Sequence, residues 1–182
     1  MTVKQTPLKD CFVIEPKVFK DKRGSFFESF NYKTFKKNTG LEIDFVQDNQ
    51  SISQYGAIRG LHFQTGEFAQ AKLIRVAQGE VLDVVVDMRP DSETYLKQFG
   101  YTLTGENNHQ LFVPKGFAHG FATLSSEVIF VYKCDNYYDK ASESGILFND
   151  KTLAIDWQIP KKDQIISEKD EHLPTLEAYL NS

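Results

Sequence analysis

Residues 72–89 read KLIRVAQGEVLDVVVDMR, and this stretch decides the fold class. Two runs rich in β-branched and aliphatic residues flank the turn residues Gly79 and Glu80. This arrangement predicts a β-hairpin, because branched side chains suit a pleated surface and glycine suits a turn. Asp83 and Asp87 are acids within an otherwise apolar strand, so each needs a partner if it is buried.

Similar strand-like runs lie on both sides of this hairpin. They occupy residues 11–19, 25–31, 45–53, 58–64, 99–104, 110–114, 119–125 and 128–138. Short strands at roughly 8–12-residue spacing predict a mainly β protein, built as a sandwich or barrel. One early helix is expected at 31–40, where Asn31 can cap the start, Phe35 points inward and Gly40 can end it. The tail is less regular, and one more short helix is expected near residues 170–181.

Length and composition indicate one globular domain over residues 1–182. A chain of 182 residues can bury a sizeable core, and it contains no linker, repeat or low-complexity tract. Aromatic residues make up 13% of the chain, mostly its 15 Phe and 8 Tyr, and this content favours β structure.

Charge and cysteine content limit the classes of partner. The formal net charge of −4 gives no basic footprint for nucleic acid, although a few arginines can still bind one small anion. Two cysteines, Cys11 and Cys134, lack a CxxC spacing and fit a reducing compartment. We find no apolar leader at the N-terminus and no run that approaches membrane-spanning length. We therefore expect a cytoplasmic protein with no membrane partner.

The histidines argue against a metal site. Residues 114–119, PKGFAH, resemble the second motif of cupin barrels, Pro-x-Gly-x-x-His. The first cupin motif would supply a His-x-His pair, but His62 is followed by Phe63 and Gln64. A transition metal usually needs three protein ligands, so we expect no bound metal.

The stretch IRGLHFQ (58–64) leaves the role of His62 open. His62 can be a hydrogen-bonded core histidine, a metal ligand or a base. A regular strand would place Arg59 and His62 on opposite faces. A bulge at Gly60 would bring them together, since glycine inside a strand often marks one.

Several charged residues lie on strands that can face an interior. The cations are Arg23, Arg59, Lys72, Arg75 and His119, and the acids are Glu28, Asp83 and Asp87. Because burying an unpaired charge is costly, so many charges predict a polar cavity for a small anionic ligand. In VIFVYKC (128–134), Tyr132 should share one face with Phe130 and Cys134. Its ring can pack on the surface, or its phenol can donate a proton.

Taken together, the motifs resemble those of the dTDP-4-dehydrorhamnose 3,5-epimerases, a cupin-fold family of sugar-nucleotide enzymes. The matching pieces are RGSFFESF (23–30), QDNQS (47–51), IRGLHFQ (58–64), AQAKLIRV (69–76), GEVLDVVVDMR (79–89), LTGEN (103–107), QLFVPKGFAHGF (110–121), YKCDNYY (132–138), SESGILFND (142–150), IDW (155–157) and SEKD (167–170). Their order and spacing cover roughly residues 10–175. The resemblance implies a cupin-type β-barrel or jelly roll whose C-terminal tail, about 160–182, packs back on the barrel.

The resemblance also implies a reaction. Carbons 3 and 5 of dTDP-4-dehydro-6-deoxy-D-glucose flank the C4 ketone, so each can lose a proton and regain one from the opposite face. His62 resembles the family's general base, Asp170 its orienting partner, Lys72 the cation that stabilises the enolate, and Tyr132 the general acid. No redox step occurs, and no cofactor is expected.

Further positions match the family's substrate-binding residues. Arg23 and Arg59 resemble the diphosphate contacts, and Glu28, Gln47, Asn49, His119, Tyr138, Glu143 and Lys169 match other binding positions. The family is a homodimer in which the N-terminal region packs across the partner. Three alternatives remain at this point: an epimerase that inverts a single carbon, a cupin that binds a sugar nucleotide without catalysis, and a metal-dependent cupin oxygenase.

Overall fold

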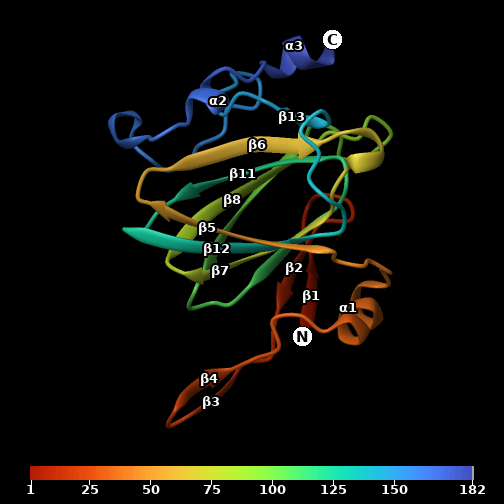
Figure 1. The fold of residues 1–182 in the computed structure, drawn as a ribbon, viewed down its shortest axis with the longest axis vertical. Coiled ribbons are helices and arrows are strands. Elements are labelled where there is room, and N and C mark those ends of the chain that lie inside the picture. Colours follow the sequence, from red (N-terminus) through yellow and green to blue (C-terminus); the bar gives the residue numbers. More distant parts are fainter. Residues whose placement is uncertain (182) are drawn as a thin grey trace.

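The computed structural model describes residues 1–181, which form two large antiparallel sheets and one small hairpin (Figure 1). The six-stranded sheet has the order β1 (Thr2–Gln5), β2 (Phe12–Glu15), β10 (Gln110–Val113), β7 (Lys72–Gln78), β12 (Glu127–Cys134) and β5 (Gln47–Gln54). The five-stranded sheet has the order β13 (Glu143–Gly145), β6 (Ile58–Gln64), β11 (Phe117–Thr123), β8 (Glu80–Asp87) and β9 (Gln98–Thr104). The mainly β, two-layered barrel expected from the sequence is confirmed.

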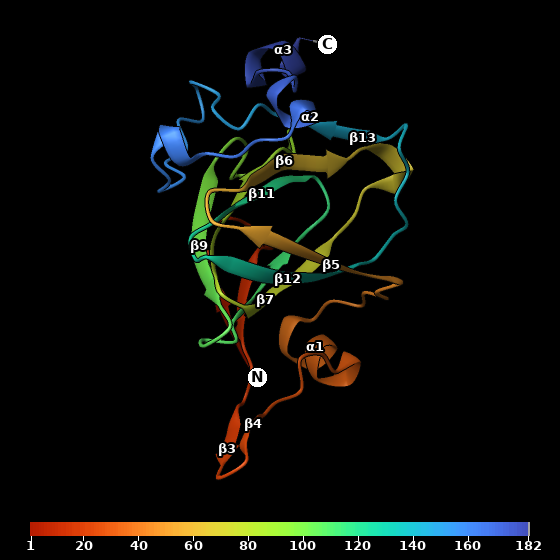
Figure 2. The ribbon, with the colours of Figure 1, turned by 60° about the vertical axis from the view of Figure 1, so that its left-hand side comes forward.

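The main core lies between the two sheets. Ile74 and Phe130 from the six-stranded sheet pack with Val85 and Phe121 from the five-stranded sheet. The rings of Phe121 and Phe130 stack with centroids 4.1 Å apart, which joins the two layers directly. Figure 2 shows the sheets curving around this core, as in a jelly roll.

A second core explains why β8 is apolar at almost every position. Leu82, Val84 and Val86 point away from the barrel interior and pack against the C-terminal segment, including Phe148 and Trp157. Alternate residues of the strand, such as Val85, face the interior. The tail is therefore tied to the barrel by apolar contacts, and it lies beside β6 in Figure 1.

Helix α1 (Tyr32–Thr39) follows the expected pattern, whereas the tail differs from it. The Asn31 side chain accepts a hydrogen bond from the Thr34 amide, Gly40 ends the helix at φ 76°, and Phe35 is fully buried. The single helix expected near 170–181 is two short ones, α2 (Glu168–Glu171) and α3 (Leu176–Leu180). Pro174 lies between them, where it lacks an amide hydrogen and restricts the residue before it.

Three expected strand runs are shorter than their apolar patterns. Residues 11–19 contain β2, which ends just before Pro16, and then β3 (Phe19–Asp21). The run 25–31 contributes only the end of β4 (Gly24–Phe26), and β12 stops at Cys134. Two 3₁₀ turns complete the chain: η1 (Gly66–Phe68) and η2 (Lys161–Asp163).

Strands β3 and β4 form an arm that projects from the body of the protein (Figure 1). Phe19 and Phe26 on this arm are 54% and 68% exposed, which leaves two large apolar rings in solvent. Within residues 1–181, no helix has the length and apolarity needed to cross a membrane.

Candidate active site

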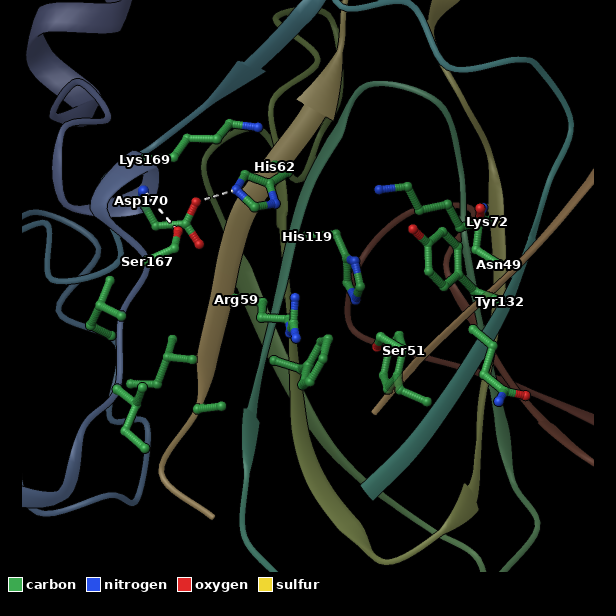
Figure 3. A pocket seen from close by; sticks show the side chains of 17 residues that line it. Asn49, Ser51, Arg59, His62, Lys72, His119, Tyr132, Ser167, Lys169 and Asp170 are labelled. Atoms are coloured by element: carbon green, nitrogen blue, oxygen red, sulfur yellow. Dashed lines mark hydrogen bonds and ion pairs between the residues drawn. The ribbon is translucent and has the colours of Figure 1, made fainter. Parts of the chain in front are cut away.

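A cavity of about 590 Å³ opens at one end of the barrel (Figure 3). β6 and β11 form one wall, β5, β7 and β12 form the other, and residues 165–170 cover the rim. The lining includes Asn49, Ser51, Arg59, His62, Lys72, His119, Phe121, Phe130, Tyr132, Ser167, Lys169 and Asp170. The polar cavity expected from the sequence is therefore present, and most of the residues expected at it are brought together.

A bulge on β6 turns Arg59 and His62 into the same cavity. Against β11, His62 pairs with His119 and Arg59 pairs with Phe121, so β6 carries one extra residue between the two pairs. Gly60 occupies the bulge at φ 116°, and a Cβ there would lie 2.6 Å from the His119 carbonyl oxygen. The bulge expected at Gly60 is confirmed, and it requires glycine.

His62 is paired with the carboxylate of Asp170. Its Nε2 lies 2.6 Å from Oδ1 of Asp170 and donates to it, while Oδ2 accepts from the Gly60 amide at 3.2 Å. The ring of His62 is 29% exposed to the cavity, but the Asp170 side chain is only 4% exposed. Burial acts to raise the pKa of Asp170, but the hydrogen bond and charge of His62 outweigh it and lower the pKa. Asp170 is thus an ionised partner for one ring nitrogen of His62.

The tail places Asp170 through local capping. The Ser167 side chain accepts from the Asp170 amide and caps α2. The amide of Ile58 donates to the Ile165 carbonyl at 3.0 Å, which fixes the preceding residues against the start of β6.

Lys72 and His119 line the cavity, and Asp83 lies buried behind His119. Nε2 of His119 lies 3.0 and 2.9 Å from the two oxygens of Asp83, and the Asp83 side chain has no exposed surface. Burial raises the pKa of Asp83, with His119 and Lys72 opposing the change. Burial also lowers the pKa of Lys72, and the charge of Asp83 is among the influences that oppose this change.

Tyr132 lies on the wall opposite His62 (Figure 3). Its ring packs against Phe130, and Nζ of Lys72 lies 5.9 Å from the ring centroid. Burial raises the pKa of the Tyr132 phenol, so the hydroxyl keeps its proton at neutral pH. Among residues 1–181, no protein group hydrogen-bonds this hydroxyl, so it is available to a ligand.

A chain of polar contacts lies at the rim of the cavity. Tyr138 donates from its hydroxyl to Glu143 at 2.9 Å, and Glu143 also pairs with Nζ of Lys169 at 2.5 Å. On β5, the Gln47 amide donates to the Asn49 side chain at 3.0 Å. Burial acts to raise the pKa of Glu143, but the contacts with Lys169 and Tyr138 lower it overall.

Three residues expected at the cavity do not line it but join residues that do: Gln47 bonds Asn49, Glu143 bonds Lys169, and Tyr138 bonds Glu143. Four others lie elsewhere in this chain. Arg23 pairs with Asp21 at the tip of the arm, and Glu28 accepts from the Asn31 side chain; neither lines the cavity. The prediction that Asp87 and Arg75 face this cavity was wrong.

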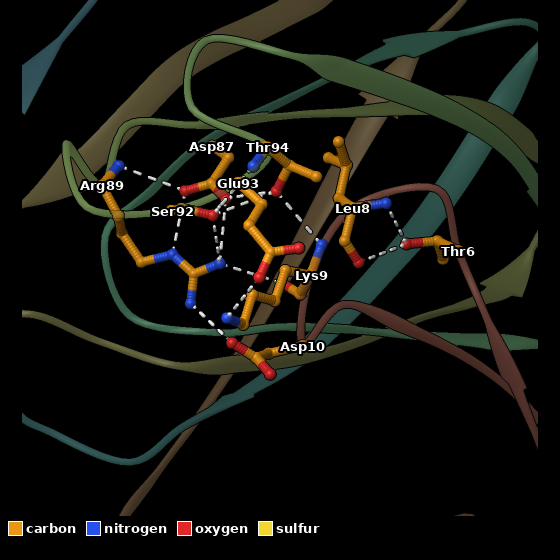
Figure 4. A network of polar contacts seen from close by, with 9 residues as sticks. All are labelled: Thr6, Leu8, Lys9, Asp10, Asp87, Arg89, Ser92, Glu93 and Thr94. Atoms are coloured by element: carbon orange, nitrogen blue, oxygen red, sulfur yellow. Dashed lines mark hydrogen bonds and ion pairs between the residues drawn. The ribbon is translucent and has the colours of Figure 1, made fainter.

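Asp87 lies at the far end of β8, where hydrogen bonds from Arg89, Ser92 and Thr94 satisfy it (Figure 4). Arg75 lies three residues after Lys72 on β7, so it points to the outer face and lines a smaller cavity of about 360 Å³.

Two lining serines, Ser51 and Ser167, were missed by the sequence reasoning. Ser51 continues the alternation that starts at Gln47 and Asn49, so strand parity could have found it. Ser167 had no comparable signal, because it lies in an irregular segment. Within residues 1–181, no group of three or more His, Cys, Asp or Glu side chains is placed to hold a metal ion.

Comparison with known proteins identifies the family. The family model of dTDP-4-dehydrorhamnose 3,5-epimerase matches residues 5–178. The chain belongs to the dTDP-4-dehydrorhamnose 3,5-epimerase family. The match covers nearly the whole of this epimerase-family chain, as did the motifs recognised in the sequence.

Individual epimerases agree in sequence and in fold. The dTDP-4-dehydrorhamnose 3,5-epimerase of Salmonella typhimurium is 48% identical over 99% of this chain and 98% of its own. The crystal structure of the Elizabethkingia anophelis enzyme is 54% identical, covers 97% of each chain and superposes with a TM-score of 0.93. The Legionella pneumophila 3,5-epimerase, solved in complex with dTDP-4-keto-L-rhamnose, is 44% identical over 97% of this chain and 93% of its own, with a TM-score of 0.93.

Proposed function

We propose that this protein epimerises dTDP-4-dehydro-6-deoxy-D-glucose at C3 and C5 to give dTDP-4-dehydro-L-rhamnose. The observation that carries the proposal is the pairing of His62 with buried Asp170 on one cavity wall, with the free Tyr132 hydroxyl on the other. A base and an acid on opposite sides of one ligand are what an inversion by proton transfer requires. Family membership supplies the substrate class.

In the proposed reaction, His62 removes the proton from the carbon next to the ketone. Asp170 holds the His62 ring through Nε2, which leaves Nδ1 to take the proton, and its negative charge stabilises the imidazolium that forms. The ammonium of Lys72 stabilises the negative charge that develops on the C4 oxygen. Tyr132 then donates a proton to the opposite face of the same carbon. His62 loses its proton to solvent and Tyr132 regains one from solvent, which restores both groups, and the sequence repeats at the second carbon. The proposed chemistry calls for neither a cofactor nor a metal.

The rest of the site would hold the nucleotide. Arg59 lines the cavity beside His62, and its guanidinium can bind diphosphate oxygens in two-point contacts. Lys169 adds a cation at the rim. Gln47, Asn49, His119, Tyr138 and Glu143 complete the proposed substrate-binding set. Because Asp170 lies on the C-terminal segment and completes a site on β6, residues 1–182 act as one epimerase domain.

Arg23 and Glu28 join the proposed site through a homodimer. The arm that carries Arg23 exposes Phe19 and Phe26, and β5 leaves one edge of its sheet unpaired within residues 1–181. Exposed rings and an open sheet edge are each typical of surfaces that a second copy covers. The arm would then lie against the partner and bring its cation to the partner's cavity. Two free, buried cysteines further support a cytoplasmic location.

Turnover of dTDP-4-dehydro-6-deoxy-D-glucose in heavy water tests the proposal. Proton NMR should show deuterium at both C3 and C5 and the product dTDP-4-dehydro-L-rhamnose. Label at one carbon alone would replace the proposal with a single-carbon epimerase. Tight binding without any exchange would replace it with a non-catalytic binding protein.

A further inference from the structure

Asp83 is a buried carboxylate that the proposed chemistry leaves without a role. It lies on β8, and its side chain has no exposed surface, so it cannot touch a ligand in the cavity. Isolated buried carboxylates are strongly disfavoured, so this one must be matched by particular partners. Asp83 hydrogen-bonds His119, which lines the cavity, and its charge also acts at a distance on Lys72, with which it forms no hydrogen bond or ion pair.

The contacts of Asp83 constrain the His119 ring. Nε2 of His119 lies within hydrogen-bond distance of both carboxylate oxygens, at 3.0 and 2.9 Å. The ring also stacks on Phe130, with centroids 6.2 Å apart and planes 21° apart. Because Nε2–H is committed to the carboxylate, Nδ1 is the ring nitrogen left for a ligand, and it is an acceptor in the neutral ring.

Asp83 is also the buried anion within the electrostatic surroundings of Lys72. Several elements supply the titratable groups that act on Lys72 or share its cavity: Asp83 on β8, His119 on β11, Tyr132 and Cys134 on β12, Glu143 on β13, Arg59 and His62 on β6, and Lys169 and Asp170 on α2. Burial raises the pKa of the Cys134 thiol to about 11, and Glu143 is already paired with Lys169 at the rim. Asp170 is the other buried carboxylate at this cavity, and it is paired with His62. At neutral pH Asp83 is therefore the buried carboxylate whose charge acts on Lys72.

Charge balance and the hydrogen bond to His119 together favour one protonation state. An ionised Asp83, a neutral His119 and a charged Lys72 sum to zero, whereas protonating Asp83 or His119 beside a charged Lys72 leaves a net positive charge among the three. The hydrogen bond to Asp83 then requires the His119 proton on Nε2. The negative charge of Asp83 favours the charged form of Lys72 that enolate stabilisation needs, against the burial that lowers the Lys72 pKa.

We propose that Asp83 is a positioning residue for the epimerisation: its hydrogen bond fixes His119 as the Nε2–H tautomer, with Nδ1 left to accept from the ligand, and its negative charge favours the ammonium form of Lys72. This inference rests on the proposed function, because the roles of Lys72 and His119 matter only if an enolate forms in the cavity. Asp83 acts through these two residues and never contacts the sugar.

The test compares Asp83→Asn with Asp87→Asn, a matched buried carboxylate on the same strand but outside the site. Lysine labelled with ¹³C at Cε is titrated by NMR in both variants, with the Lys72 signal assigned from Lys72→Arg. Asp83→Asn should lower the Lys72 pKa, move the basic limb of the kcat profile to lower pH and reduce kcat by about tenfold or more. Asp87→Asn should leave the Lys72 titration at its wild-type position.

An unchanged Lys72 titration in folded Asp83→Asn would overturn the proposal. If that variant does not fold, ¹⁵N NMR of histidine in the wild-type protein still tests the inference. His119 must then carry its proton on Nε2, and a proton on Nδ1 alone would refute the inference. Absence of proton exchange by the wild-type enzyme would instead defeat the proposed function, since neither NMR readout depends on turnover.

Discussion

Replacing Asp170 by Asn removes the charge that supports His62 while keeping the shape of the side chain. The carboxylate is 4% exposed and accepts from Nε2 of His62 at 2.6 Å. A hydrogen bond to a charged group contributes about 1.5–3 kcal/mol, against about 1 kcal/mol for a neutral one. The difference of about 0.5–2 kcal/mol acts on the imidazolium that forms during proton removal. At about 1.4 kcal/mol per factor of ten, kcat should fall roughly 2- to 30-fold.

Steady-state turnover of the keto sugar measures this effect. Because Asp170 is buried behind His62, KM should change far less than kcat. Glu168→Gln is the matched control, since Glu168 lies two residues earlier in α2 with an exposed side chain and should leave kcat unchanged. Circular dichroism verifies that both variants fold. A folded Asp170→Asn enzyme with wild-type kcat would refute the reasoning that links Asp170 to the base.

Three further predictions address other parts of the molecule. Tyr132→Phe should retain deuterium exchange but lose most inversion, because His62 can still remove and return a proton on one face. Deuterium exchange is followed by NMR, and inversion is measured from the chirality of the product. Undiminished inversion would count against Tyr132 as the acid. Burial acts to raise the pKa of Asp87, but hydrogen bonds from Arg89, Ser92 and Thr94 hold this pKa at about 2 instead of 3.8. Asp87→Asn should therefore lower the free energy of unfolding by about 2 kcal/mol at pH 7. This contribution is present above pH 3.8 and is lost as the pH falls towards 2, so urea melts of the two proteins should converge there; a constant difference would contradict the assignment. Phe26→Asp on the arm should shift the sedimentation coefficient from dimer to monomer, and an unchanged dimer would remove the arm from the interface.

Strand parity explains how much of the site the sequence could predict. The run 81–89 and the alternation in 58–64 were enough to predict a two-layered β protein with polar groups facing inward, and Gly60 marked the bulge that joins Arg59 and His62. Asp83 and Asp87 have the same parity, so the sequence could not separate them. Four residues along a strand correspond to about 13 Å, enough to put one at the cavity and the other at the far end of the barrel.

Contacts between distant segments were beyond the sequence pattern alone. Asp170 lies 108 residues from His62, on a four-residue helix with no periodic signal of its own. Its pairing with His62 was anticipated through the family resemblance. Arg23 and Glu28 pose a different difficulty, because one chain does not contain the surroundings in which they are proposed to act.

The central claim is that His62 removes the proton next to the ketone. Deuterium exchange at C3 and C5 of dTDP-4-dehydro-6-deoxy-D-glucose, followed by NMR in heavy water with folded His62→Ala, tests it most directly. We expect no label at either carbon above that in enzyme-free buffer. Label that enters at a rate close to that of the wild-type enzyme would contradict the assignment of His62 as the base.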